Sequence, residues 1–421
     1  MKRAIALIVC LTVTFFMQGQ ILKRISDRAK TRAENNVNTK VDNTVDKAVD
    51  SALTIKKKDK TGNDATGADD NNEETKKAES STPASLKAYS KYDFVPGEKI
   101  IVFEDFAQDA VGDFPDKWNT NASAEIVTFD QLMGKWLKIS KQGVYMPDFI
   151  DSLPDNFTLE YDLLCDNPGK VWGFYTSLTK LSDRQHPESW QSENNRFTYT
   201  VAAYPDGNST SLVERKKDGV GESSITTGTK QFSDKTKPVH IALWRQKERV
   251  RVYFNQEKVW DLPKVLSQTA RYNSFVIWLQ GATDDGNFYL SNLRFAVGIP
   301  DTRNKILTQN KWVTHGILFD VNSATIKPES YGTLKEMANV LNEYGDLKVK
   351  IVGHTDADGK DDANLDLSKR RAASVKESLV KEFGIVESRM ETDGKGEGDP
   401  IDNNTTPAGK ANNRRVEFIK I

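Results

Sequence analysis

Cysteine and histidine are scarce in this sequence, and their scarcity excludes several kinds of site. The chain has two cysteines and four histidines among 421 residues. Cys10 lies in an apolar run near the N-terminus, which leaves Cys165 as the single cysteine expected in a mature chain. One cysteine cannot form an internal disulfide, and no histidine has the companion spacing of a zinc site. We therefore expect no disulfide framework, no metal site and no organic cofactor.

An excess of charge of either sign is also missing. The chain has 59 Lys plus Arg against 60 Asp plus Glu, a formal net charge of -1. A balanced sequence without a basic stripe does not attract a polyanion. Nucleic acid is therefore not an expected partner.

Long apolar runs are absent except for one short segment at the start. The apolar run extends over the fourteen residues from Ala4 to Met17. Lys2 and Arg3 precede it, and Gln18-Gly19-Gln20 follow it. At about 1.5 Å per residue such a helix does not cross a hydrocarbon core of about 30 Å, which disfavours the alternative of a membrane anchor. A charged start, an apolar stretch and a small residue at its end are typical of a secretory signal peptide. We predict a signal peptide over residues 1–19 and hence export.

Two segments of low hydrophobicity follow the predicted signal peptide. Between residues 20 and 55 an apolar side chain recurs at every fourth position, from Ile21 to Leu53. A four-residue repeat drifts around a helix of 3.6 residues per turn, so residues 21–53 are predicted to form a weakly self-associating helix or a partly folded stalk, with a stable coiled coil as the alternative. Residues 56–92 contain hardly any apolar side chain and are predicted to be a disordered linker.

Residues 98–299 show the period-two alternation of β-strands. Examples are Phe157 to Leu163, Arg196 to Ala202, and Val250 to Phe254, which forms a predicted hairpin with Val259-Trp260. About ten such strands favour a sandwich of two sheets. An outer-membrane barrel is the alternative, but several runs are shorter than the ~9–11 residues of a barrel strand, and charged residues interrupt them.

Residues 310–421 alternate instead between strand and helix patterns. Strands are predicted at Ile317–Val321, Lys348–Val352 and Val416–Ile419, with one helix beginning at Pro328 and another over Leu367–Phe383. The βαβαβ order predicts a small layered α/β domain. The expected fold class is therefore multidomain, with an all-β sandwich followed by a small α/β domain.

Five short motifs in this C-terminal segment carry a specific resemblance. They are Phe319-Asp-Val-Asn322, Gly353-His-Thr-Asp356, Asn364-Leu-Asp-Leu-Ser-Lys-Arg-Arg371-Ala372, Gly394-Lys-Gly396 and Asn413-Arg-Arg-Val-Glu417. In this order and spacing they resemble the OmpA-like family, the C-terminal domains of OmpA, Pal and MotB. The resemblance implies a domain without catalytic activity that binds the diaminopimelate side chain of peptidoglycan.

The resemblance brings Asp356 and Arg371 together as the main ligand-binding residues. A fixed carboxylate beside a guanidinium complements the ammonium and carboxylate of an amino-acid head group through charge-assisted hydrogen bonds. Thr355, Asn364 and Arg414 are further candidates for ligand binding. For Asn364, capping or ordering of the second helix is the preferred role, and for Arg414 an ion pair that holds the fold is preferred over a place in the groove.

The ends of the β-rich segment resemble a concanavalin/laminin-G-type jelly roll. It opens with Phe103-Glu-Asp-Phe106 and closes with Asn287 to Phe295. Glucanases on this fold carry Glu-x-Asp-x-(x)-Glu, whereas Glu160-Tyr-Asp162 is followed here by Leu163-Leu-Cys165 and lacks the second glutamate. We therefore expect no enzyme. The sandwich ligand is left open between a carbohydrate and an envelope protein.

Taken together, these patterns predict an exported protein of the periplasm or outer membrane of a Gram-negative bacterium. Its C-terminal domain would bind peptidoglycan and tether the sandwich to the wall. The alternatives are an OmpA-type barrel porin with a wall anchor and a carbohydrate-active enzyme in the sandwich. A peptidoglycan-anchored motor stator would require a transmembrane helix, for which the sequence gives no candidate.

Overall fold

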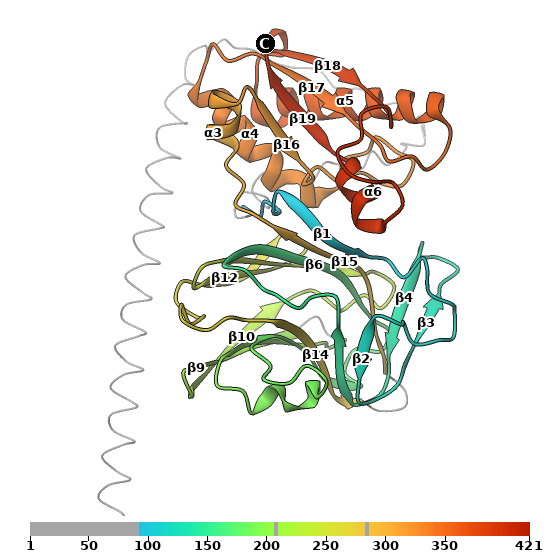
Figure 1. The fold of residues 1–421 in the computed structure, drawn as a ribbon, viewed down its shortest axis with the longest axis vertical. Coiled ribbons are helices and arrows are strands. Elements are labelled where there is room, and N and C mark those ends of the chain that lie inside the picture. Colours follow the sequence, from blue (N-terminus) through green and yellow to red (C-terminus); the bar gives the residue numbers. More distant parts are fainter. Residues whose placement is uncertain (1–91, 206–208, 283–285) are drawn as a thin grey trace, which may run out of the picture. The chain divides into compact units, whose positions relative to one another are not determined.

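The computed structural model describes residues 92–205, 209–282 and 286–421 (Figure 1). The predicted signal peptide, the predicted N-terminal helix and residues 56–91 of the predicted linker lie outside these residues. The predicted end of the linker at residue 92 is wrong, because Tyr92 is fully buried and its ring packs edge-on against Tyr253. Within the described part of the chain, no helix has the length and apolar character needed to cross a membrane.

Residues 99–297 form two antiparallel sheets, an arrangement visible in Figure 1. The first has the order β13-β12-β11-β6-β15-β4-β3, and β1 also pairs with β15. Its strands are β1 (Lys99–Glu104), β3 (Ala124–Thr128), β4 (Lys135–Ile139), β6 (Asn156–Cys165), β11 (Val239–Gln246), β12 (Arg249–Phe254), β13 (Glu257–Leu262) and β15 (Phe288–Val297). The prediction of a sheet-rich middle segment is confirmed, and the likeness to a jelly roll stays a prediction.

The second sheet has the order β10-β9-β8-β7-β14-β5-β2. Its strands are β2 (Trp118–Thr120), β5 (Gly143–Pro147), β7 (Val171–Thr179), β8 (Arg196–Ala202), β9 (Ser209–Lys217), β10 (Val220–Thr229) and β14 (Ser274–Ala282), and a short 3₁₀ helix η1 (Pro187–Gln191) precedes β8. Trp190 of η1 is buried.

The alternation along β6 explains how the sandwich core forms. Phe157, Leu159, Tyr161 and Leu163 point into the cluster between the sheets, since successive side chains of a strand point to opposite faces. The Tyr161 hydroxyl bonds to the hydroxyls of Thr176 and Tyr199 in the other sheet, each at 2.7 Å, which satisfies a polar group inside an apolar core.

The opposite face of β6 carries polar residues that are nevertheless buried. Thr158 and Glu160 are at most 2% exposed. The segment that leads into β1 covers Thr158, whose hydroxyl oxygen accepts a hydrogen bond from the Gly97 N–H at 2.9 Å. Glu160 faces the C-terminal domain, and both stretches belong to one compact unit of the chain. This part of the outer face of the sheet is therefore an internal surface of the protein.

The C-terminal domain is a four-stranded sheet with helices on it. The sheet order is β16-β19-β17-β18, with β17 and β18 parallel and the other pairs antiparallel. The helices α4 and α5 lie on one face of the sheet (Figure 1). The elements are α3 (Thr302–Thr308), β16 (Lys311–Thr314), η2 (Pro328–Ser330), α4 (Tyr331–Glu343), β17 (Val349–Gly353), α5 (Asp361–Phe383), η3 (Glu387–Arg389), β18 (Met390–Gly394), α6 (Pro407–Asn413) and β19 (Val416–Lys420).

Several predicted boundaries in this domain are wrong. The first strand is β16, whereas the predicted strand Ile317–Val321 is a loop in which only Phe319 makes an isolated bridge to Ile326. The backbone of Leu318 bonds to the hydroxyl of Ser330 and to the Lys327 N–H, so its groups are satisfied without a sheet. The domain core also includes Ile306 of α3, which places its start before residue 310.

Candidate functional site

Asp356 lies in the loop that follows β17. This loop is tied down on both sides, since the His354 N–H donates to the Arg415 carbonyl and the Thr355 N–H donates to the Gly396 carbonyl. These hydrogen bonds fix Asp356 just beyond the carboxyl end of β17, where the residue is 7% exposed. A carboxylate held by its backbone in this way keeps its place without a ligand.

Asn364 fixes the other end of the same loop. Its side-chain amide donates to the carbonyls of Asp356 and Asp358 at 3.3 and 3.2 Å and to the Glu397 carboxylate at 2.6 Å. The helix begins at Asp361, six residues before the predicted start, so Asn364 lies within its first turn and Lys360 is the capping residue. Asn364 therefore orders the loop that leads into α5 and does not cap the helix, so that of the two roles predicted for it, capping or ordering, only capping is wrong.

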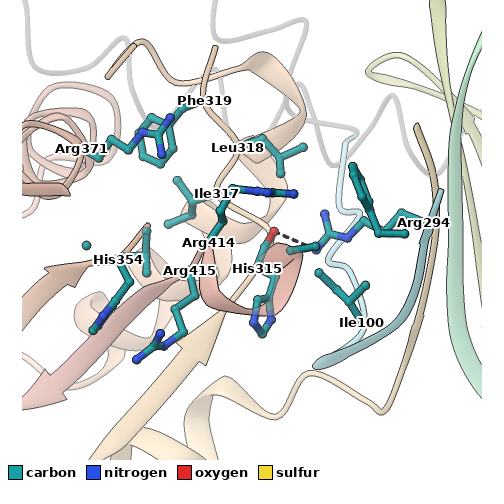
Figure 2. Close-up of a pocket in the computed structure, with 14 residues that line it drawn as sticks. Ile100, Arg294, His315, Ile317, Leu318, Phe319, His354, Arg371, Arg414 and Arg415 are labelled. Carbon is teal, nitrogen blue, oxygen red and sulfur yellow. Dashed lines mark hydrogen bonds between the residues drawn. The ribbon is translucent and has the colours of Figure 1, made fainter. Parts of the chain in front are cut away.

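The approach of α5 to the sheet brings Arg371 to the site. A Cβ on Gly353 would lie 2.3 Å from the Ser368 carbonyl oxygen, so only glycine permits this approach. One turn further along α5, the Arg371 guanidinium lies over the Phe319 ring at 4.9 Å and its Nε donates to the Ser323 carbonyl at 3.0 Å. In Figure 2 Arg371 and Phe319 lie against one another.

The direct partner of Asp356 is Arg414, which follows α6. Arg414 donates from Nη1 to one carboxylate oxygen of Asp356, and the other oxygen accepts from the Asp358 N–H at 3.1 Å. The guanidinium of Arg414 also lies 5.4 Å from the centre of the Phe103 ring, which belongs to β1 of the sandwich. Arg414 is thus both an ion-pair partner, as preferred from the sequence, and part of the pocket wall.

Arg371 has no carboxylate within ion-pair distance among the residues that the structure describes. Burial lowers its pKa to about 10, and the nearby charge of Arg414 adds to the effect. The group still carries its charge at neutral pH. A half-buried guanidinium bonded only to backbone carbonyls is suited to an external anion.

All five residues singled out from the sequence line one pocket. Its volume is about 490 Å³, and Thr355, Asp356, Asn364, Arg371 and Arg414 are part of its wall. The hydroxyl oxygen of Thr355 is buried and has no hydrogen-bond partner within the described ranges. These five residues therefore bring one carboxylate, two guanidiniums, a side-chain amide and an unused hydroxyl to the pocket wall.

His354 and its neighbours form a separate buried cluster beside the pocket. The His354 Nε2 lies 3.6 Å from a carboxylate oxygen of Glu417, whose other oxygen accepts from Arg415 Nε at 2.8 Å. Burial opposes the charge of Glu417, but the nearby His354 ring and the hydrogen bonds from Lys311 and Arg415 prevail and lower its pKa to about 2. This cluster joins β17, β19 and β16.

The far wall of the pocket comes from the sandwich and was missed by sequence reasoning. Glu160 and Asp162 on β6, His240 on β11, and Asn292 and Arg294 on β15 line it. The register pairs Asp162 with His240 and Glu160 with Arg294, on the outer face of the sheet. Single polar residues within three separate strand patterns carry no signal that these strands are neighbours.

Hydrogen bonds connect Asp162, His240 and Asn292 of these sandwich residues. The His240 Nδ1 lies 2.8 Å from Asp162 Oδ1, and Asn292 donates to Asp162 Oδ2 at 2.7 Å. Burial disfavours the imidazolium, but Asp162 and Glu160 outweigh it and raise the pKa of His240 to about 10.

Across the described positions, no group of three His, Cys, Asp or Glu side chains is arranged to hold a metal ion.

Comparison with known proteins identifies the C-terminal segment. Residues 318–414 match the OmpA family. The chain is 45% identical over 101 residues to outer membrane porin F of Pseudomonas fluorescens, which covers 24% of this chain and 31% of that protein. It is 39% identical over 108 residues to the peptidoglycan-binding protein ArfA of Mycobacterium bovis, which covers 25% of this chain and 33% of that protein.

A solved structure, the peptidoglycan-associated lipoprotein from Burkholderia pseudomallei, is 25% identical with a TM-score of 0.25, and the match covers 29% of this chain and 98% of that one. The chain spans about a third of the length of the two curated relatives. The matched part contains all the C-terminal pocket residues named above. Residues 318–414 are therefore an OmpA-family domain, as the five motifs predicted.

Proposed function

We propose that the C-terminal domain binds peptidoglycan and anchors the protein to the cell wall. The observation that carries the proposal is the single pocket in which Asp356 offers a carboxylate and Arg371 a guanidinium without an ion-pair partner. These two groups complement an ammonium and a carboxylate on one carbon, which is the free end of diaminopimelate.

The contacts of Asp356 leave room for such an ammonium. Each oxygen of a carboxylate has two lone pairs. One oxygen accepts from the Asp358 N–H and the other from Arg414, so both can accept a further hydrogen bond. The carboxylate of the head group would bind Arg371, and the hydroxyl of Thr355 would supply a neutral hydrogen bond. Asn364 would act indirectly, by holding the loop.

The names of the relatives agree with this assignment. ArfA is named as a peptidoglycan-binding protein, and porin F as an outer-membrane protein. Together with the predicted signal peptide, these names support an exported protein of the periplasm or outer membrane. The sandwich would be the module that the wall anchor holds in place.

A glycosidase in the sandwich is disfavoured by the state of its carboxylates. A general acid for glycoside hydrolysis requires a raised pKa. Burial would raise the pKa of Glu160 and Asp162, but Arg294 and His240 prevail at Glu160, and His240 prevails at Asp162, so that both pKa values are lowered. Both groups therefore stay ionised, and we infer that neither serves as the general acid of a glycosidase.

The direct test is sedimentation with insoluble peptidoglycan that contains diaminopimelate. Removal of one partner of a buried charge pair costs about 2–5 kcal/mol, so Asp356→Ala and Arg371→Ala should each lose nearly all binding. Asp366→Ala and Arg370→Ala are matched controls, because these residues form an exposed ion pair on the same helix. Equal binding by all four variants, or no binding by the wild type, would sink the proposal.

A further inference from the structure

A second cavity adjoins the pocket and is lined by arginines from both domains. It has a volume of about 170 Å³, several times the ~30 Å³ share of a water molecule. Arg294 comes from β15 of the sandwich, Arg371 from α5, and Arg414 and Arg415 from the turn before β19. No Asp or Glu is among the described residues of its wall. Figure 2 shows Arg371, Arg414 and Arg294 spread across it.

The four guanidiniums are not equally neutralised. Arg415 is paired with Glu417 at 2.8 Å, and Arg414 with Asp356. Arg294 lies 3.8 Å from Glu160 and donates from Nη2 to the His315 carbonyl at 2.8 Å. Arg371 has only backbone carbonyls and the Phe319 ring. Positive charge is therefore in excess around the cavity.

Arg294 is a buried residue of this wall and not a surface side chain. It is 6% exposed, and its Nε lies 3.8 Å from Glu160 Oε1, too far for a hydrogen bond. Burial lowers the pKa of both Arg294 and Arg371, and repulsion from Arg414 adds to the lowering at each. A bound anion would relieve this repulsion.

We propose that this cavity is a subsite for a second carboxylate of the same peptidoglycan stem peptide, formed jointly by the sandwich and the C-terminal domain. The inference rests on the proposed function, because Arg294, Arg371 and Arg414 line both this cavity and the pocket of Asp356. A stem peptide carries carboxylates beyond the diaminopimelate head group, at its isoglutamate residue and at its C-terminus. Apolar side chains of Phe103, Ile317 and Leu318 would accompany the attached carbons.

This arrangement makes the sandwich part of the recognition site. Arg294 would distinguish a stem peptide with a free carboxylate from one in which that group is amidated, since an amide offers no charge to the guanidinium. The C-terminal domain alone lacks this residue.

Titration calorimetry of the full chain with soluble stem peptides tests the subsite. Three ligands are compared: the peptide with both carboxylates free, the peptide amidated at isoglutamate, and the peptide amidated at its C-terminus. One amidated form should bind about tenfold more weakly to the wild type, and it identifies the source of the carboxylate. In Arg294→Gln this preference should disappear, whereas Asp356→Ala should lose all three ligands.

The preference is the ratio of the affinities of one protein variant for the free and the amidated peptide. A partial loss of folded protein lowers both affinities alike and leaves this ratio unchanged. Because Arg294 also holds the His315 carbonyl, Leu318→Glu serves as a second variant that places a carboxylate in the cavity and should abolish the same preference. Equal binding of all three peptides to the wild type, or an unchanged preference in Arg294→Gln and Leu318→Glu, would overturn the subsite while leaving the anchor intact. No binding of any peptide to the wild type would overturn both proposals.

Discussion

At the scale of single residues, the shape of the Arg371 guanidinium matters as much as its charge. It stacks on the Phe319 ring, donates from Nε to the Ser323 carbonyl, and places Nη2 3.5 Å from the Asp320 carbonyl, while the side chain also lines the pocket. A lysine ammonium cannot stack on the ring while it offers two coplanar N–H donors to a carboxylate, as a guanidinium does.

Arg371→Lys should therefore bind peptidoglycan about tenfold or more weakly, although its charge is kept. Sedimentation with insoluble peptidoglycan at several protein concentrations measures the change. Arg370→Lys, on the exposed side of the same helix, should bind like the wild type. An Arg371→Lys protein with full affinity would show that charge alone is needed.

Glu417 predicts a dependence of stability on acid pH. Its pKa of about 2 in the folded state lies below the ordinary 4.5, so its ionised form stabilises the fold above about pH 4.5, and this contribution is lost as the pH falls towards 2. The shift corresponds to about 3 kcal/mol of unfolding free energy.

Glu417→Gln should be less stable than the wild type at pH 7, and the difference should narrow between pH 4.5 and 2. Urea unfolding of both proteins across this range measures it, and the comparison cancels the titration of the other carboxylates. A difference that stays constant with pH would assign the loss to packing and not to the charge of Glu417.

At the scale of elements, the sequence predicts best where the apolar spacing is regular. The hairpin of Val250–Phe254 with Val259–Trp260 appears as β12 and β13. The start of α5 was missed because Asp361 and Asp362 precede its first apolar position and Lys360 gives no capping signal. The loop Ile317–Val321 is rich in apolar residues, like a strand. Its backbone groups, however, find their hydrogen-bond partners in residues 326–330 and not in a neighbouring strand of the sheet.

The contact between α5 and β17 sets the distance between Asp356 and Arg371. Gly353→Ala would place a methyl group 2.3 Å from the Ser368 carbonyl oxygen, and the backbone on both sides would have to move. Such overpacking costs about 1–3 kcal/mol of unfolding free energy.

Gly345→Ala is the matched control, because no atom lies within 4 Å of the added methyl group. Chemical denaturation should show a loss for Gly353→Ala and almost none for Gly345→Ala. Peptidoglycan binding should fall in Gly353→Ala even under conditions where it is folded. Equal stability of the two variants would mean that α5 can move away from β17 at no cost.

At the scale of the whole molecule, the pocket was only half predictable. Its C-terminal wall carries sequence motifs, whereas its sandwich wall arises from the pairing of β6 with β11 and β15 and from contact with the next domain. Glu160-Tyr-Asp162 was interpreted as an incomplete catalytic motif. The structure places Glu160 against Arg294 and Asp162 against His240, contacts that depend on residues 78 to 134 positions apart in the chain.

Asn412 is the residue that most directly joins the sandwich to the C-terminal domain. Its side-chain amide accepts from the Ile100 N–H at 3.0 Å and donates to the Ile100 carbonyl at 2.9 Å, as a neighbouring strand would. Its own carbonyl lies 3.0 Å from His315 Nε2. Since Arg294 also bonds to the carbonyl of His315, Asn412 and Arg294 support the same contact.

Asn412→Ala should uncouple the two domains, because it leaves two buried backbone groups of Ile100 without partners at a cost of about 1–3 kcal/mol each. Calorimetric unfolding should change from one transition in the wild type to a broadened or divided one in the variant. Asn342→Ala, on the exposed surface of α4, should keep the wild-type profile. If Asn412→Ala unfolds like Asn342→Ala, the domains are held by their apolar contacts. If it divides the transition, the pocket depends on a junction that one side chain maintains.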